Sequence, residues 1–151
     1  MNLLDANSVM TLNACYGDAL DRFDLAAWQA LFTPDAVYRA QARENFDRDL
    51  PLAAIYLDGH GMMTDRITGI EKTLVFAPRF TRHVIGLPKI EGASSRTPFI
   101  IVQTVTTGLP EILATGCYHD TLASTSDGIR LASRNAVYDN ALIPNSLVYP
   151  L

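Results

Sequence analysis

Apolar residues in the first half of the chain recur at the spacing of amphipathic helices. They recur every three or four positions over residues 5–23, which predicts a first helix. Asp24 precedes a second apolar run and can cap a second helix. Thr33-Pro34-Asp35 should end that helix, because proline disfavours the helical conformation in the residue before it. A third helix is predicted over about 62–74, after a glycine-rich turn that contains His60.

The second half of the chain alternates in the manner of strands. Four segments are rich in β-branched and aromatic residues, and turn-forming residues separate them. Asp127-Gly128 is a strong hairpin signal. The expected strands of this antiparallel meander are 81–90, 98–107, 112–123 and 129–138, preceded by shorter ones at 36–42 and 52–57. Helices first and hairpins later indicate an α+β fold in one domain, 1–151, with the helices on one face of a curved sheet.

The charged stretch at 43–49 interrupts the apolar pattern, so we expect a surface loop or arm that offers contact to a partner. Composition narrows the class of protein further. A net charge of −4 with 48% hydrophobic and 19% charged residues is typical of a globular protein, and disfavours nucleic acid as a partner. No apolar run is long enough for a membrane span, and the first residues do not form a secretory signal. The cytoplasm is therefore the expected location.

The sequence contains no recognisable metal or cofactor motif. Cys15 and Cys117 are too isolated for a disulfide framework and are expected as reduced, buried thiols. Together with His60, His83 and His119 they form no ligand pattern of a zinc or iron–sulfur site. A phosphate-binding glycine loop is also absent from the sequence. We therefore expect no metal and no cofactor to be bound by this chain.

Two residues are candidates for acid–base chemistry. His83 lies in a predicted strand on the face opposite Arg82, and an imidazole in an interior pocket could serve as a general base. Tyr38 could donate a phenolic proton into the same pocket. The commoner role is structural for both: a hydrogen-bonded histidine in the core or at a subunit contact, and a large tyrosine with its hydroxyl at the rim. Four arginines are suited to pairing with carboxylates of a neighbouring chain: Arg66, Arg82, Arg130 and Arg134.

Several segments resemble one known family. Residues 24–38 (DLAAWQALFTPDAVY) are similar to the opening of the β subunits of aromatic-ring-hydroxylating dioxygenases, and of a wider group that includes ketosteroid isomerase and scytalone dehydratase. The order and spacing of 44–53, 61–67 and 81–86 resemble the dioxygenase β subunits more narrowly. The terminal residues 149–151 extend the likeness to the small subunits of terephthalate dioxygenase and salicylate hydroxylase systems. The resemblance covers nearly the whole chain.

This resemblance implies a cystatin/NTF2-like cone: a strongly curved, mixed, largely antiparallel sheet with about three N-terminal helices on one face. It implies a structural, non-catalytic subunit of an oxidoreductase that acts on an aromatic compound in catabolism, with an aromatic carboxylate as the expected substrate. A Rieske [2Fe–2S] cluster and a mononuclear Fe(II) would lie on a partner α subunit. The assembly would hold three α and three β chains, and the β chain would form a homotrimer within or without it. The family supplies no catalytic residue to transfer.

Two other functions stay open at this point. A stand-alone isomerase or dehydratase of the ketosteroid isomerase or scytalone dehydratase type would use the pocket, with Tyr38 and His83 as acid and base. A small-molecule binding or scaffolding module would have a pocket in which polar groups do not converge.

Overall fold

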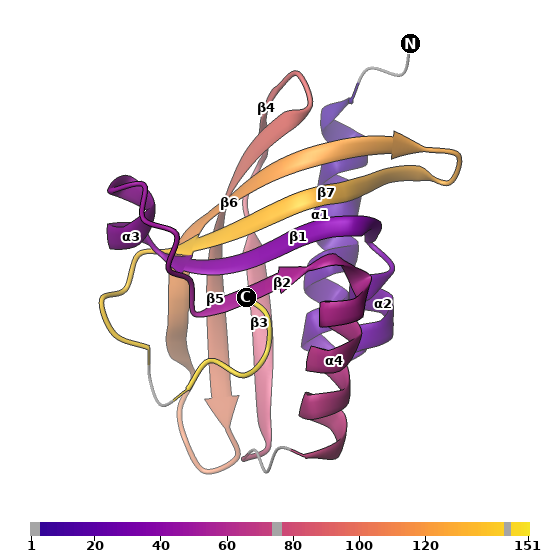
Figure 1. Ribbon diagram of the computed structural model, residues 1–151. Helices are drawn as coiled ribbons and strands as arrows, with labels where there is room; N and C mark the ends of the chain where they lie inside the picture. Colours follow the sequence, from indigo (N-terminus) through magenta and orange to yellow (C-terminus); the bar gives the residue numbers. More distant parts are fainter. Residues whose placement is uncertain (1–3, 74–76, 144–145) are drawn as a thin grey trace.

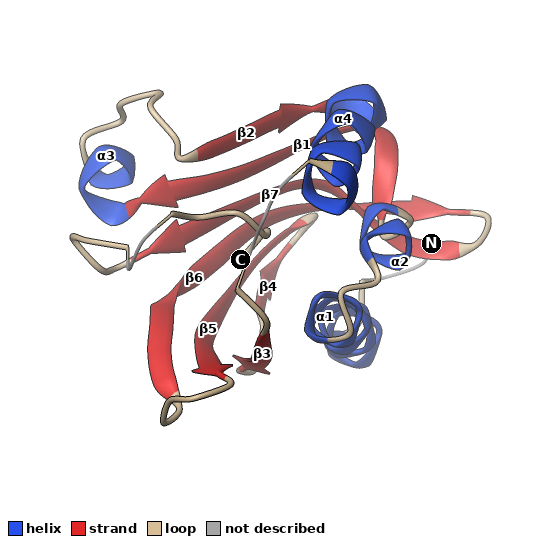
Figure 2. Cartoon of the chain, turned by 90° about the horizontal axis from the view of Figure 1, so that it is seen from below, coloured by secondary structure: helices blue, strands red, loops and turns tan. Residues whose placement is uncertain are grey.

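The computed structural model describes residues 4–73, 77–143 and 146–151. Helices α1, α2 and α4 gather on one side of a strongly curved sheet, while α3 stands apart at the far end of β1 (Figures 1 and 2). The helices are α1 (Ala6–Asp21), α2 (Leu25–Gln29), α3 (Arg43–Asp47) and α4 (Gly59–Lys72). The strands are β1 (Phe32–Ala42), β2 (Ile55–Asp58), β3 (Arg79–Ile85), β4 (Lys89–Glu91), β5 (Ser94–Val105), β6 (Glu111–Thr125) and β7 (Gly128–Tyr138).

The sheet has seven strands in the order β2-β1-β7-β6-β5-β3, with β4 paired to β5 beside β3. Strands β1 and β7 run parallel, and the other paired strands run antiparallel. Bulges after Ile101 and Thr121 shift the register and bend the long strands. The predicted curved, mixed and largely antiparallel sheet with helices on one face is therefore confirmed, and the sheet does not close into a barrel.

The sequence pattern explains how the helices attach to the sheet. Buried residues of α1 follow the three-and-four spacing, so one side of the helix faces the sheet. The Asp5 side chain accepts a hydrogen bond from the Ser8 amide at the start of α1. Asp24 caps α2 in the same way, through the Ala27 amide at 3.0 Å, as predicted. We call the space between the concave face of the sheet and α1, α2 and α4 the interior.

Two expectations about local structure were wrong. Residues 43–47 form the exposed helix α3 instead of a loop, because Arg43 pairs with Asp47, and Glu44 with Arg48, one helical turn apart. The third helix begins at Gly59, so His60 is helical and not part of a turn. Its ring Nε2 lies 3.1 Å from the Phe32 carbonyl oxygen.

Strand boundaries and one cysteine also differ from expectation. The predicted strand 81–90 is two strands, β3 and β4, since Pro88 between them has no amide hydrogen to pair. Strand β1 begins at Phe32, where a register shift accommodates Pro34. Cys15 is exposed rather than buried, whereas Cys117 is half-buried.

Candidate functional site

Aromatic side chains line the interior. Trp28 from α2 lies edge-on to Tyr38 of β1 with ring centroids 5.4 Å apart, and Tyr16 of α1 lies edge-on to Tyr118 of β6 at 5.5 Å. All four side chains are fully buried. Edge-to-face rings of this kind form a stiff wall, because the quadrupoles of the rings favour this angle. The interior is thus a close-packed aromatic surface on which a few polar groups are placed.

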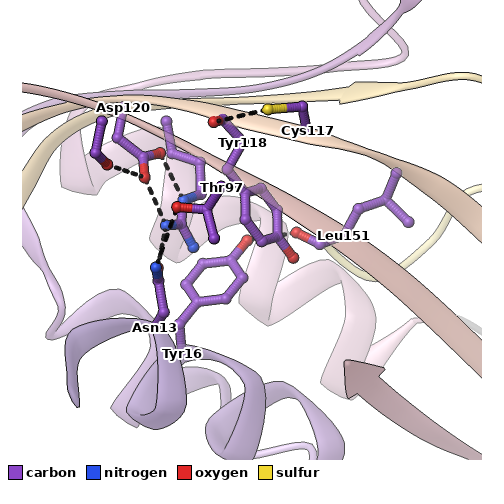
Figure 3. A network of polar contacts seen from close by, with 9 residues as sticks. Asn13, Tyr16, Thr97, Cys117, Tyr118, Asp120 and Leu151 are labelled. Carbon is purple, nitrogen blue, oxygen red and sulfur yellow. Dashed lines mark hydrogen bonds and ion pairs between the residues drawn. The ribbon is translucent and has the colours of Figure 1, made fainter. Parts of the chain in front are cut away.

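A buried ion pair forms the first polar group (Figure 3). Arg134 is 1% exposed, and its Nε and Nη2 atoms each donate to a carboxylate oxygen of Asp120 at 2.8 Å. Nη2 also donates to the Asn13 side-chain oxygen at 2.6 Å. The guanidinium lies between the rings of Tyr16 and Tyr118, 4.1 and 4.0 Å from their centroids. Burial lowers the pKa of Arg134, but the Asp120 carboxylate outweighs it, so the pKa is raised and the arginine stays charged.

The second polar group joins α1 to β3. His83 Nδ1 lies 2.6 Å from Asp21 Oδ1, and the His83 amide donates to Asp21 Oδ2 at 3.0 Å. The Thr81 hydroxyl donates to the same carboxylate at 3.2 Å. Burial raises the pKa of Asp21, yet the hydrogen bonds from His83 outweigh burial and leave this pKa below its usual value. Asp21 therefore links α1 to β3: its carboxylate accepts hydrogen bonds from three donor groups, the Thr81 hydroxyl and the amide and imidazole of His83.

The orientation of His83 agrees with the prediction. Its side chain is 3% exposed, while the neighbouring Arg82 is exposed on the opposite face of β3. His83 Nε2 has no hydrogen-bond partner within the described ranges. The ring borders a cavity of about 30 Å³, which is large enough for one or two water molecules. The ring also lies edge-on to Tyr16, with centroids 6.4 Å apart.

Tyr38 lies deeper than expected. Its hydroxyl is buried instead of lying at the rim, and it accepts a hydrogen bond from the Leu151 amide at 2.8 Å. A main-chain oxygen of Leu151 accepts from the hydroxyls of Tyr16, at 2.5 Å, and Tyr38, at 3.3 Å. Burial raises the pKa of the Tyr38 hydroxyl well above its usual value, so it stays protonated. Within the described residues, His83 and Tyr38 do not hydrogen-bond to each other; Tyr16 lies edge-on to the His83 ring and shares the Leu151 oxygen with Tyr38.

The four arginines divide into two groups, and the prediction for them was partly wrong. Arg134 pairs within the chain, and Arg66 donates to the carbonyl oxygens of Leu147 and Val148. Arg134 is buried on β7, and the half-buried Arg66 of α4 reaches main-chain oxygens of the last described segment, so both guanidiniums have partners within the chain. Arg82 is exposed and Arg130 half-buried, so the prediction stands only for these two.

Sequence reasoning did not identify Asp21, Asp120, Tyr16 or Leu151. An aspartate outside a motif does not announce its role, and two of these contacts join residues far apart in the sequence: Asp21 to His83 over 62 positions, and Tyr16 to Leu151 over 135. One signal was present at Asp21, which is a single acid at the end of an apolar helix face. It does not specify a partner.

The Asp21 carboxylate should make stability depend on acid. Its folded-state pKa is lowered, so its contribution to stability is present above the unfolded pKa of about 3.9 and is lost as pH falls through the folded pKa. We expect Asp21→Asn to destabilise the chain at pH 6 and to cost clearly less near pH 3, measured by urea unfolding. Asp18→Asn, on the exposed side of the same helix, should cost little at either pH. An equal cost of Asp21→Asn at both pH values would contradict the assignment.

Exposed apolar side chains cluster on the outer face of the sheet. Phe80 and Val84 of β3 are 61% and 57% exposed, and Ile112 of β6 is 63% exposed. The register places Val84 beside Ile100 and Val102 beside Ile112, so β5 joins the two edges of this cluster. Contiguous apolar side chains on a surface mark contact sites, because association removes them from water.

The residues that the structure describes contain no group of three or more histidine, cysteine, aspartate or glutamate side chains that could hold a metal ion. Within the same residues, no helix has the length and apolar character that a membrane crossing needs.

Known proteins give a consistent picture. Residues 1–135 match the SnoaL-like domain family. One relative is subunit beta 2 of the terminal oxygenase component of terephthalate 1,2-dioxygenase from a Comamonas species. It is 29% identical over 99% of this chain and 100% of that protein. The anthranilate 1,2-dioxygenase small subunit of Burkholderia cepacia is 26% identical, over 87% of this chain and 85% of that one.

A solved structure from Novosphingobium aromaticivorans, assigned as the β subunit of an aromatic-ring-hydroxylating dioxygenase, superposes with a TM-score of 0.86. The two chains are 34% identical, and the match covers 97% of this chain and 96% of that one. Identity at this level over the whole fold exceeds what a shared cone alone would produce. The chain belongs to the SnoaL-like domain family and, within it, to the small (β) subunits of aromatic-ring-hydroxylating dioxygenases.

Proposed function

We propose that this chain is the structural β subunit of a Rieske non-haem iron oxygenase that hydroxylates an aromatic carboxylate in catabolism. The observation that carries the proposal is the full-length match to a terephthalate dioxygenase β subunit, together with the 34% identity to a second β subunit. The apolar cluster on the outer face supports it, since a subunit contact would bury Phe80, Val84 and Ile112.

The finer features of the assembly belong to the same proposal. A large α subunit carries the Rieske cluster and the mononuclear iron, and three α chains join three β chains. Residues 1–151 fold as one domain that contributes support to this assembly in the cytoplasm. The aromatic substrate binds to the α subunit, so the β chain needs no catalytic residue of its own.

His83 and Tyr38 serve structure in this proposal. Each makes hydrogen bonds within the chain: His83 to Asp21, and Tyr38 to Leu151. The competing isomerase or dehydratase would need these groups open to a substrate. Their burial against the chain's own atoms favours the structural role.

Co-expression with a Rieske α subunit tests the proposal. We expect the two chains to co-purify as one complex, which contains iron and hydroxylates at least one compound among terephthalate, anthranilate and benzoate. The isolated β chain should hydroxylate none of them. A β chain that never associates with an α subunit, or that turns over a ketosteroid by itself, would rule the proposal out.

Variants of the two candidate residues separate the structural role from the catalytic one. His83→Ala and Tyr38→Phe should change hydroxylation per assembled complex by less than about tenfold, which corresponds to 1.4 kcal/mol in the barrier. The yield of complex should fall instead, because His83→Ala removes the imidazole that hydrogen-bonds to the largely buried Asp21 carboxylate.

Asp18→Asn, an exposed change on α1 that should cost little stability, is the control for yield. A fully assembled His83→Ala complex that loses about 100-fold or more of its activity would indicate a general base, and the structural role would be wrong.

A further inference from the structure

The last described segment, residues 146–151, enters the interior. In Figure 2 the end of the chain lies between the sheet and the helices rather than on the outside. Leu151 is 1% exposed and Pro150 is buried, although Leu142, a few residues earlier, is among the most exposed apolar side chains. The segment therefore passes from the surface into the space that the sheet and helices enclose.

Polar contacts hold this segment at both ends. Near the opening, Arg66 of α4 donates to the carbonyl oxygens of Leu147 and Val148, at 3.1 and 2.7 Å. At the deep end, the hydroxyls of Tyr16 and Tyr38 converge on one main-chain oxygen of Leu151. These contacts are to main-chain atoms, so the interior recognises an acceptor oxygen at its deep end and not a particular side chain.

The deep end holds further polar atoms without a partner. The Tyr118 hydroxyl is fully buried and has no hydrogen-bond partner among the described residues. Figure 3 shows the rings of Tyr16 and Tyr118 pointing toward Leu151. His83 Nε2, also without a partner in that part of the chain, borders the small cavity beside the segment. Buried donors and acceptors that are left unpaired are costly, which makes such a cluster unusual in a core.

The surroundings of the tyrosine hydroxyls at the deep end are largely aromatic. The small cavity has both apolar and polar walls: it is lined by Leu20, Phe23, Ile101 and Leu113, by Arg79, Thr81, His83 and Gln103, and by residues 146–151. Trp28 and Phe32 stack edge-on beside Tyr38. Flat aromatic walls with converging hydroxyls are the features of a site for a planar ring that bears an acceptor oxygen.

We propose that residues 146–151 are an internal plug, which occupies in cis a binding site for a one-ring aromatic molecule with a carbonyl or carboxylate oxygen. The Leu151 main-chain oxygen takes the place of the oxygen of the ligand, and the Leu151 side chain and Pro150 take the place of the ring. The plug keeps the interior closed while it is in place. This site is separate from the proposed support of an α subunit and goes beyond it.

Deletion of residues 150–151 tests the proposal, because it removes the buried end and leaves the Arg66 contacts intact. The probes are acetophenone, benzoate and benzene, and the measurement is ligand-observed NMR titration. We expect acetophenone, benzoate or both to bind the deletion variant at least about tenfold more tightly than the intact chain. Acetophenone and benzoate distinguish a neutral carbonyl from a carboxylate, and benzene reports the apolar space alone.

Tyr16→Phe in the deletion background tests the role of the hydroxyls. It should weaken the oxygen-bearing probe by about five- to tenfold, as expected for one hydrogen bond, and leave benzene unchanged. Leu142→Ala in the intact chain is the matched control, since it removes an exposed leucine close in sequence to residues 146–151. This variant should bind no probe. Circular dichroism and thermal unfolding establish that each variant is folded.

Three results would overturn the proposal. One is a folded deletion variant that binds none of the probes. Another is equal affinity for benzene and the oxygen-bearing probes, which indicates a plain void. If the deletion variant does not fold, Leu151→Ala is titrated in its place with the same expectations. The third result is that neither the deletion variant nor Leu151→Ala folds, which would show that the segment is an indispensable part of the core and not a plug. None of these results depends on assembly with an α subunit.

Discussion

Asp120→Ala is expected to destabilise the folded chain by about 3–5 kcal/mol, because it leaves the buried Arg134 guanidinium without a counter-charge. Arg134 retains only Asn13 and the faces of two tyrosine rings. Neither group offsets a full charge in a site that water does not reach. The measurement is the free energy of unfolding from urea titration, followed by circular dichroism at neutral pH.

Two companion variants make this result specific. Asp139→Ala removes an exposed carboxylate that pairs with Arg43, so it should cost less than about 1 kcal/mol. The double variant Asp120→Leu with Arg134→Met should recover much of the lost stability, since apolar residues of similar volume often replace a buried pair at little cost. An Asp120→Ala chain within about 1 kcal/mol of the original would mean that the guanidinium finds water or another partner.

Gly116→Ala is the second variant with a large expected effect. Gly116 lies on β6 opposite Tyr138 of β7, where the two strands approach closely. An added Cβ would meet the Val137 carbonyl oxygen at a distance that no real Cβ shows, and would lie 2.9 Å from the Tyr138 Cα atom and from Phe99 Cζ. Backbone atoms cannot rotate away as a side chain does, so we expect a loss of roughly 3 kcal/mol or more.

Gly61→Ala is its control. Gly61 lies in the exposed first turn of α4 with nothing within 4 Å of an added Cβ. Alanine there should be neutral or stabilising by up to about 1 kcal/mol, because glycine loses more backbone entropy in a helix. Thermal unfolding of both variants decides the matter: a Gly116→Ala chain as stable as Gly61→Ala would show that β6 and β7 can separate without cost.

The helices and most strands of the later sheet were predictable because their signal is local. The spacing of apolar residues in α1 shows which side of the helix is buried, and the aspartate caps mark where α1 and α2 begin. The charges of α3 also carried a usable signal, since Arg43 and Asp47 lie one helical turn apart. The signal was missed because a dense run of charge is also typical of a loop.

The candidate site was only partly predictable, for a different reason. The period-two rule placed His83 on the inner face of its strand, but only the curvature of the sheet brings α1 close enough for Asp21 to reach it. Arg134 shows the limit most clearly. The predicted hairpin at Asp127-Gly128 places Asp120 opposite Arg134, but a guanidinium is usually a surface group, and the sequence does not show that this pair is buried.

The parallel pairing of β1 with β7 has a consequence for synthesis on the ribosome. Strand β1 leaves the exit tunnel early, yet its neighbour on one side, β7, is the last strand to be made. During most of translation, β1 therefore exposes an unpaired edge and the aromatic residues Phe32 and Tyr38, with only β2 available to pair. Contacts between such distant segments also form slowly. The sheet therefore cannot be completed around β1 until β7 has emerged from the ribosome.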